Sequence, residues 1–187
     1  MAGNTIATSL YKIANDVRLL GSGPRCAIGE LSLPATQPGS SIMPGKVNPV
    51  MSEAVTMVAA RVFGNHSTVT WCGANGHFQL NVMMPLMAKC ILESIRLLAN
   101  VSDIFRRNCV EGIEARVERC NELIEYSLSM VTSLAPVIGY DQASMIAKES
   151  VESGRTVREL CADRLEELGL TAKQLSEALD AASMAGE

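Results

Sequence analysis

Hydrophobic residues recur every three or four positions between residues 5 and 20, which predicts an amphipathic helix. The repeating positions are Ile6, Leu10, Ile13, Val17 and Leu20. Gly21, Gly23 and Pro24 follow directly, and glycine and proline placed there end a helix. We therefore expect a first helix with one apolar face.

A second, longer helix is predicted to begin at Asn48 and Pro49. Asparagine is favoured as an N-cap, and proline is favoured at the first helical position. The segment that follows is apolar on nearly every side, and the pattern continues past Gly64 toward Trp71. We expect one uninterrupted helix over this stretch.

A third helix is predicted from about Gln79 to Arg106, with a kink at Pro85. It too is apolar nearly all round, and helices of this kind are buried. A chain of 187 residues has too little mass of its own to cover three such helices. We therefore expect other subunits, or a preceding part of the same polypeptide, to cover the remainder.

The predicted helices become short, amphipathic and more charged from about residue 111 onward. Thr156 with Glu159, and Thr171 with Gln174, have the spacing of capping boxes. These pairs predict two helix starts within 20 residues of each other, as in a small helical domain.

No segment alternates in the manner of a β-strand, so the predicted fold class is all-α. We expect a partial helical-bundle domain over residues 1–112 and a small, separate all-α domain over residues 113–187. The loop between the first two helices belongs to the bundle domain.

Charge and composition exclude several classes of protein. The net charge is −4, no dense basic run occurs and only 4% of residues are aromatic, so nucleic acid is not an expected partner. No uncharged apolar run reaches the length of a membrane span, and the first 20 residues lack the features of a signal peptide.

The six cysteines form no CxxC pair and have irregular gaps. They predict free, buried thiols in a reducing compartment, which we expect to be the cytoplasm or the mitochondrial matrix. The two histidines, His66 and His77, lack the spacing of a zinc site, so no metal is expected.

The stretch PGSSIMPGKVNPV, residues 38–50, is a loop that ends at a predicted helix start. It is not a nucleotide-binding P-loop or a hydrolase elbow, because the glycine spacing is wrong for both and no strand precedes it. Lys46 and Asn48 beside a helix N-terminus predict a site for a small anion, most simply a carboxylate. The glycines would let the loop close as a lid carrying Ser40 and Ser41. A surface loop of ordinary turn residues is the alternative.

The segment GSSIMPGKVNP, Gly39 to Pro49, resembles the signature loop of the fumarase/aspartase superfamily. The resemblance extends to IANDVRLLGSGPRCAIGELSLP, GNHSTVTWCGANGHFQLNV, NCVEGIEA and IGYDQASMIAKE, and so covers essentially the whole chain. Gly45 before Lys46, together with the run NGHFQLNV, favours class II fumarase over aspartase. The resemblance implies part of a long-helix bundle that forms a homotetramer core.

The resemblance also implies roles for six residues in the reversible hydration of fumarate to malate, without metal or other cofactor. Ser40 would take the C3 proton of malate, and Glu53 would pair with a catalytic histidine of another subunit. The residues expected to contact the dicarboxylate substrate are Ser41, Lys46, Val47 and Asn48.

The family's catalytic Thr-His segment and its substrate-binding Ser-x-Asn-type segment have no counterpart in this sequence. We therefore expect a C-terminal portion of a class II fumarase, inactive alone because the site needs segments from several subunits. The alternatives are an aspartate ammonia-lyase of the same superfamily, a non-catalytic helical assembly protein and, against the acidic balance of residues 113–187, a helix-turn-helix DNA binder.

Overall fold

The computed structural model describes residues 2–23, 25–37 and 46–186. The contacts divide the chain into two compact units, Met1–Arg116 and Val117–Glu187. The first unit extends beyond the expected boundary at residue 112, because residues 114–115 pair with a segment that precedes the loop.

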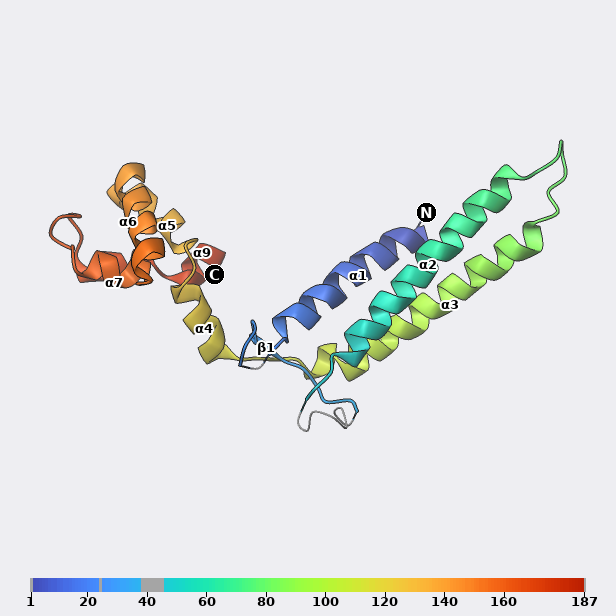
Figure 1. Cartoon of the computed structure of the whole chain (residues 1–187), viewed down its shortest axis with the longest axis horizontal. Coiled ribbons are helices and arrows are strands. Elements are labelled where there is room, and N and C mark those ends of the chain that lie inside the picture. The colour runs from blue at the N-terminus through green and yellow to red at the C-terminus, as the bar shows by residue number, and fades with distance from the viewer. Residues whose placement is uncertain (1, 24, 38–45, 187) are drawn as a thin grey trace. The chain divides into compact units, whose positions relative to one another are not determined.

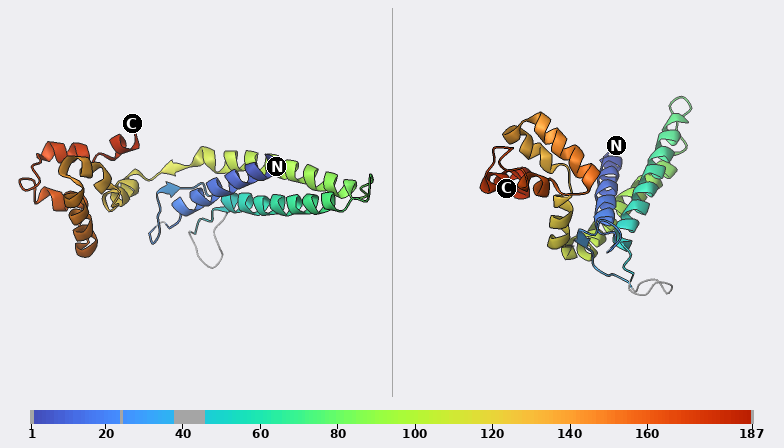
Figure 2. Two further views of the ribbon diagram at one scale, coloured as in Figure 1. Left: turned by 90° about the horizontal axis from the view of Figure 1, so that it is seen from above. Right: turned by 60° about the vertical axis from the view of Figure 1, so that its left-hand side comes forward.

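Three long helices build the first unit: α1 (Ala2–Leu20), α2 (Val50–Ala74) and α3 (Met84–Asn108). Helices α2 and α3 form a long hairpin, and α1 packs along α2 (Figures 1 and 2). Two small clusters form the core; their buried members are Ala14, Val55, Val101, Phe105 and Cys109 in one, and Ala7, Ala59, Val62 and Leu98 in the other. Several of these residues are alanines, which let the helices approach closely.

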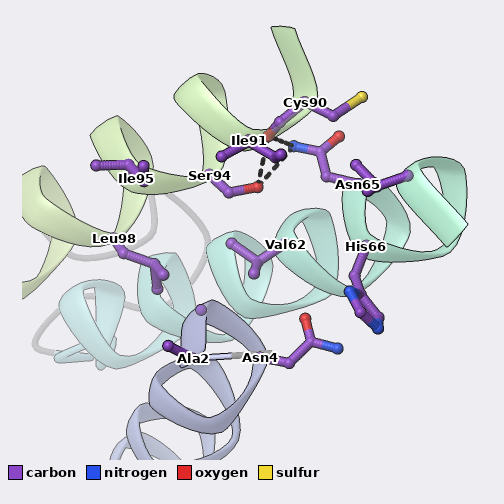
Figure 3. A pocket seen from close by; sticks show the side chains of 12 residues that line it. Ala2, Asn4, Val62, Asn65, His66, Cys90, Ile91, Ser94, Ile95 and Leu98 are labelled. Carbon is purple, nitrogen blue, oxygen red and sulfur yellow. Dashed lines mark hydrogen bonds between the residues drawn. The ribbon is translucent and has the colours of Figure 1, made fainter. Parts of the chain in front are cut away.

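A buried asparagine joins the two arms of the hairpin. Asn65 is 3% exposed, and its amide nitrogen lies 3.3 Å from the Cys90 carbonyl oxygen and 3.1 Å from Ser94 Oγ (Figure 3). The same nitrogen lies 3.0 Å from Glu93 Oε2. Since all three acceptors lie on α3, this amide fixes the register of α2 against α3. Arg61 also binds Glu93, at 3.0 Å, and its hydrogen bond is the first cause that holds the pKa of Glu93 below its usual value.

A two-residue antiparallel ladder closes the base of the first unit. Strand β1 (Leu31–Ser32) pairs with β2 (Glu114–Ala115), with Leu31 opposite Ala115. The 3₁₀ turn η1 (Val110–Gly112) connects α3 to β2. Apart from this ladder and an isolated bridge between His77 and Leu80, the described residues hold no β structure, and the predicted all-α class is confirmed.

The predicted start of the third helix is wrong. The backbone groups of His77 and Leu80 bind each other at the hairpin tip, and Asn81 Oδ1 accepts a hydrogen bond from the Met83 N–H at 2.9 Å. Helix α3 therefore begins at Met84, which leaves Pro85 in its first turn. A proline there breaks no helical hydrogen bond, so the predicted kink inside the helix is also wrong.

The second helix does run past Gly64, and it ends at Ala74. Its start differs from the prediction by one position, since Pro49 is the N-cap and Asn48 lies outside the helix. Within the described residues, no side chain caps this helix start.

Six short helices build the second unit: α4 (Val117–Glu125), α5 (Met130–Ile138), α6 (Tyr140–Ser153), α7 (Val157–Ala162), α8 (Ala172–Ala178) and α9 (Ala181–Ala185). They surround one contiguous core, whose buried members are Met130, Leu134, Ile146, Val157, Leu160, Cys161, Leu170, Leu175 and Leu179. This unit therefore has a hydrophobic centre of its own.

Both predicted capping boxes are confirmed. Thr156 Oγ1 accepts from the Glu159 N–H at 3.2 Å, and Glu159 Oε2 accepts from the Thr156 N–H at 3.0 Å. Thr171 and Gln174 make the equivalent pair of bonds. These side chains satisfy backbone donors that would otherwise lack a partner at the helix starts.

The hairpin of the first unit carries large apolar side chains on its surface. Those more than half exposed are Met57, Trp71, Leu80, Val82, Met84, Leu92 and Ile95, and Phe78 at the tip is fully exposed. An apolar surface of this kind is typical of an interaction site. It agrees with the expectation that the long helices are covered by other parts of an assembly.

The cysteines are all free thiols. Cys72, Cys90, Cys109 and Cys161 are buried, and burial raises the pKa of the Cys109 and Cys161 thiols. The expectation of burial is wrong for Cys26, which is exposed in the loop after α1. None of the helices in the described ranges has the length and apolarity needed to cross a membrane.

Candidate active site

A cavity of about 530 Å³ lies at the base of the first unit, where the end of α1, strand β1 and the start of α2 meet. Figure 1 shows β1 beside the C-terminal end of α1. Four of the six predicted site residues line this cavity: Lys46, Val47, Asn48 and Glu53. The structure therefore brings the predicted cation, the predicted amide and the predicted acid together.

Residues 46–49 run without regular structure into α2. Lys46 and Val47 are exposed, Asn48 is half-buried, and the Asn48 carbonyl accepts from the Val50 N–H at 2.9 Å. The ammonium and the amide thus lie beside a helix start whose backbone dipoles favour negative charge. A carboxylate in this cavity would meet all three groups.

Glu53 is half-buried in the first turn of α2, and its backbone N–H donates to the Pro49 carbonyl at 3.0 Å. Within the described ranges, its carboxylate makes no ion pair. The carboxylate is therefore free to orient a group that this part of the chain does not supply. His66 and His77 do not line the cavity.

The two predicted serines, Ser40 and Ser41, lie outside the described residues. Their distances to Lys46 therefore do not enter the geometry of the site, and their roles stay predictions.

Two arginines that the sequence interpretation did not single out also line the cavity. Arg18 lies in the last turn of α1, and its guanidinium donates to Asn15 Oδ1 at 2.9 Å. Arg116 directly follows β2, and its backbone N–H donates to the Glu30 carbonyl at 2.8 Å. Arg18 stands in the segment IANDVRLLGSGPR that carries the resemblance, so that segment held a signal for it. Nothing local marks Arg116, since only the β1–β2 pairing brings it here.

Two close backbone approaches hold the cavity wall in place. A Cβ added at Gly21 would lie 2.7 Å from a methyl carbon of Leu33, and one added at Gly112 would lie 2.6 Å from Pro34 Cγ. The segment 31–34 is thus packed so closely against the end of α1 and η1 that a side chain at Gly21 or Gly112 would require Leu33 or Pro34 to shift. Gly21 and Leu33 both line the cavity, so this packing helps to fix its wall.

A second cavity, of about 390 Å³, lies between the start of α1 and the middle of the hairpin. Its lining is mainly apolar, and Figure 3 shows Asn65 pointing toward α3 while His66 points away from it. The Asn65 amide already binds acceptors of α3. Among the described residues, no three His, Cys, Asp or Glu side chains are placed to hold a metal ion.

Comparisons with known proteins match both units. Residues 1–64 match the family model described as Lyase, and residues 130–186 match the model described as Fumarase C C-terminus. The first match includes Lys46, Asn48 and Glu53, which line the cavity. The two models thus agree on one kind of enzyme.

Fumarate hydratases are among the most similar relatives. Fumarate hydratase 2 of Arabidopsis thaliana is 61% identical over 83% of the chain and 31% of its own length. Human mitochondrial fumarate hydratase is 55% identical over 99% of the chain and 36% of its own length. The chain therefore spans about a third of the length of these curated relatives.

The fold agrees with a solved fumarase. The crystal structure of a class II fumarase from Schistosoma mansoni superposes with a TM-score of 0.89 at 37% identity, over 98% of this chain and 38% of that one. The signature loop, the cavity, the two family models and the superposition agree: the chain belongs to the class II fumarase family of lyases.

Proposed function

We propose that this chain supplies the carboxylate-binding part of a fumarate hydratase, which reversibly adds water to fumarate to give L-malate. The observation that carries the proposal is the shared cavity of Lys46, Asn48 and Glu53, in a chain 55–61% identical to fumarate hydratases. The substrate is a dicarboxylate, and the cavity offers it a lysine, an amide and a helix start.

The chemistry requires removal of a proton from C3 of malate and departure of the C2 hydroxyl as water. Loss of the C3 proton puts a second negative charge on the neighbouring carboxylate in the transition state. Lys46 would stabilise that charge, because the electrostatic attraction grows as the charge develops. Ser40 would accept the C3 proton, and Ser41 and Val47 would contact the substrate.

Glu53 would orient a histidine, as the acid of a catalytic triad does. Neither His66 nor His77 lies in the cavity, so the histidine comes from another polypeptide segment. The exposed apolar face of the α2–α3 hairpin supports assembly with such segments, and we propose a homotetramer for the complete enzyme. The cytoplasm or the mitochondrial matrix is its proposed location, and the human relative is named as mitochondrial.

A chimera tests this function. The last third of human fumarate hydratase is replaced by residues 1–187, and the loss of fumarate absorbance in water is measured. We expect hydration, and we expect Ser40→Ala to lower kcat by at least about a hundredfold, the usual minimum for loss of a general base. The isolated chain should show no hydration.

Three results would contradict the proposal. A well-folded tetrameric chimera without hydratase activity would exclude the function, and near-normal kcat in Ser40→Ala would exclude the role of that serine. Consumption of fumarate only in the presence of ammonia would favour the aspartate ammonia-lyase alternative.

A further inference from the structure

Ser52 interrupts the apolar pattern on the inner face of α2. It shares that face with Val55, Ala59 and Val62, which follow it at helical spacing and are all buried. Ser52 itself is 0% exposed, and in the described part of the chain only Asn65 is a second buried polar residue. The Asn65 amide binds acceptors on α3, whereas the Ser52 hydroxyl makes no hydrogen bond of normal geometry among the described residues. Ser52 is thus a polar group in the core without a satisfied partner.

A hydroxyl at this position is unfavourable for stability. A buried polar group without a partner gives up its hydration and gains no hydrogen bond in return. Alanine would occupy nearly the same volume without that loss. Where a core position departs from what stability favours, the departure indicates a functional reason.

A thiol lies beside this hydroxyl. Burial raises the pKa of the Cys109 thiol, and the neighbouring Ser52 side chain opposes that rise. Cys109 is 4% exposed and directly follows α3, where its N–H donates to the Phe105 carbonyl at 3.0 Å and its carbonyl accepts from the Gly112 N–H at 3.1 Å. Because α3 holds its backbone on one side and η1 on the other, Cys109 offers Ser52 a fixed point of contact.

The first turn of α2 has few other anchors. Within the described residues no side chain caps it, and Ser52 is its one fully buried residue. Glu53 comes next in the turn and lines the candidate cavity, which Ser52 does not. Successive residues of a helix point about 100° apart. Any rotation of the turn about Ser52 therefore changes the direction in which Glu53 points.

We propose that Ser52 is a positioning residue of the candidate active site: its hydroxyl, seated beside the Cys109 thiol, fixes the rotation of the first turn of α2 and so aims the Glu53 carboxylate. The inference rests on the proposed function and deepens it. Neither Ser52 nor Cys109 lines the cavity, so both act through Glu53 and make no contact with the substrate.

Hydrogen exchange of the 187-residue chain tests this positioning without any need for activity. The reporter is the Glu53 N–H, which donates to the Pro49 carbonyl at 3.0 Å. In Ser52→Ala this amide should exchange at least about fivefold faster, because the turn opens more often. The Tm should stay the same or rise, because the unpaired hydroxyl is gone.

Ser67→Ala is the matched control. Ser67 also lies on α2, but it is exposed and its hydroxyl donates to the Phe63 carbonyl at 3.1 Å. Its replacement should leave the exchange of the Glu53 N–H unchanged.

Turnover of the chimera separates orientation from packing. Ser52→Ala should lower kcat about tenfold and change KM by less than about twofold, because Glu53 is proposed to orient the histidine and not to bind the substrate. In a Glu53→Gln chimera, Ser52→Ala should cause no further loss, since residues that act through one another are not additive. Ser52→Cys keeps a polar group beside Cys109 and should restore most of the lost kcat, which a packing role would not predict.

Three results would overturn the inference: unchanged Glu53 exchange in Ser52→Ala, normal kcat in that variant, or an equal further loss in the Glu53→Gln background. Each of them leaves the proposed function standing where the unmodified chimera hydrates fumarate. If Ser52→Ala speeds the Glu53 exchange but the unmodified chimera is inactive, the positioning role stands and the hydratase assignment falls.

Discussion

The two units of this chain bury their apolar residues in different ways. The second unit gathers nine buried side chains into one core within about 70 residues. The first unit is longer, yet its buried residues form two thin clusters of five and four members, and its hairpin leaves Trp71 69% exposed and Leu92 66% exposed. The second unit therefore resembles an independent domain, whereas the first resembles part of a larger core.

Replacing a leucine by alanine should lower stability in the second unit but weaken self-association in the first. Leu160 is 1% exposed at the centre of the second core, and Leu160→Ala should lower the free energy of unfolding of that unit by about 2–5 kcal/mol. Leu92→Ala removes an exposed side chain, so it should hardly affect stability but should weaken self-association. Hydrogen exchange resolved by region measures the first effect, and light scattering measures the second. Equal loss of protection in both variants would contradict the comparison.

The next largest effect is expected where the first unit is tightly packed. Gly21→Ala places a methyl group against Leu33 and should destabilise the base of the first unit by about 1–3 kcal/mol. The matched control is Gly64→Ala, because a Cβ at Gly64 meets no atom within 4 Å. Alanine there should stabilise α2 by roughly 0.5–1 kcal/mol. Urea unfolding followed by hydrogen exchange of α1 and α2 compares the two variants. If both were more stable than the unmodified chain, the Leu33 side chain must have moved to make room for the added methyl group.

Local helix capping should matter in the second unit, where the helices are short. Thr156→Ala removes the oxygen that accepts from the Glu159 N–H, and it should cost about 1 kcal/mol. Ser129 is the N-cap of α5 but makes no capping bond with its side chain, so Ser129→Ala is the control and should cost less. Thermal unfolding of the second unit measures the stability lost in each variant. An equal loss would show that the capping bond of Thr156 does not account for the effect.

The smallest effect concerns pH. Arg61 and Asn65 hold the pKa of Glu93 below its usual value, so the folded hairpin binds this proton less readily than the unfolded chain does. The resulting stabilisation is complete above the usual pKa of a glutamate and is lost as the pH falls through the lowered pKa. Glu93→Gln should therefore make hairpin protection less sensitive to acid. Glu177→Gln, on α8, should leave that sensitivity unchanged. If it reduced the sensitivity equally, the contact of Glu93 with Arg61 and Asn65 would not be responsible.

Sequence reasoning succeeded where the deciding interactions are local. The capping boxes at Thr156 and Thr171 depend on residues three positions apart, and the length of α2 follows from one continuous apolar pattern. The start of α3 could not be read in this way. It depends on the pairing of His77 with Leu80 and on the Asn81 side chain, which together hold the chain out of a helix until Met84.

The lining of the candidate cavity was predictable in part for the same reason, whereas the roles of its residues stay predictions. Lys46, Asn48 and Glu53 lie within eight residues of each other, and the motif that contains them is long and specific. The sequence could not place Arg116 in the cavity lining, because its position depends on a two-residue ladder between segments far apart in the sequence. The ladder has no strand pattern of its own, since two residues are too few to alternate.

The ladder between β1 and β2 also has a consequence during synthesis. Lys46 and Glu53 leave the ribosome well before Arg116, which also lines the cavity and directly follows β2. Until then the nascent chain can form helical segments but lacks part of the cavity lining. A metabolite that stabilises the finished pocket would therefore act on the released or nearly complete polypeptide, and not on its early intermediates.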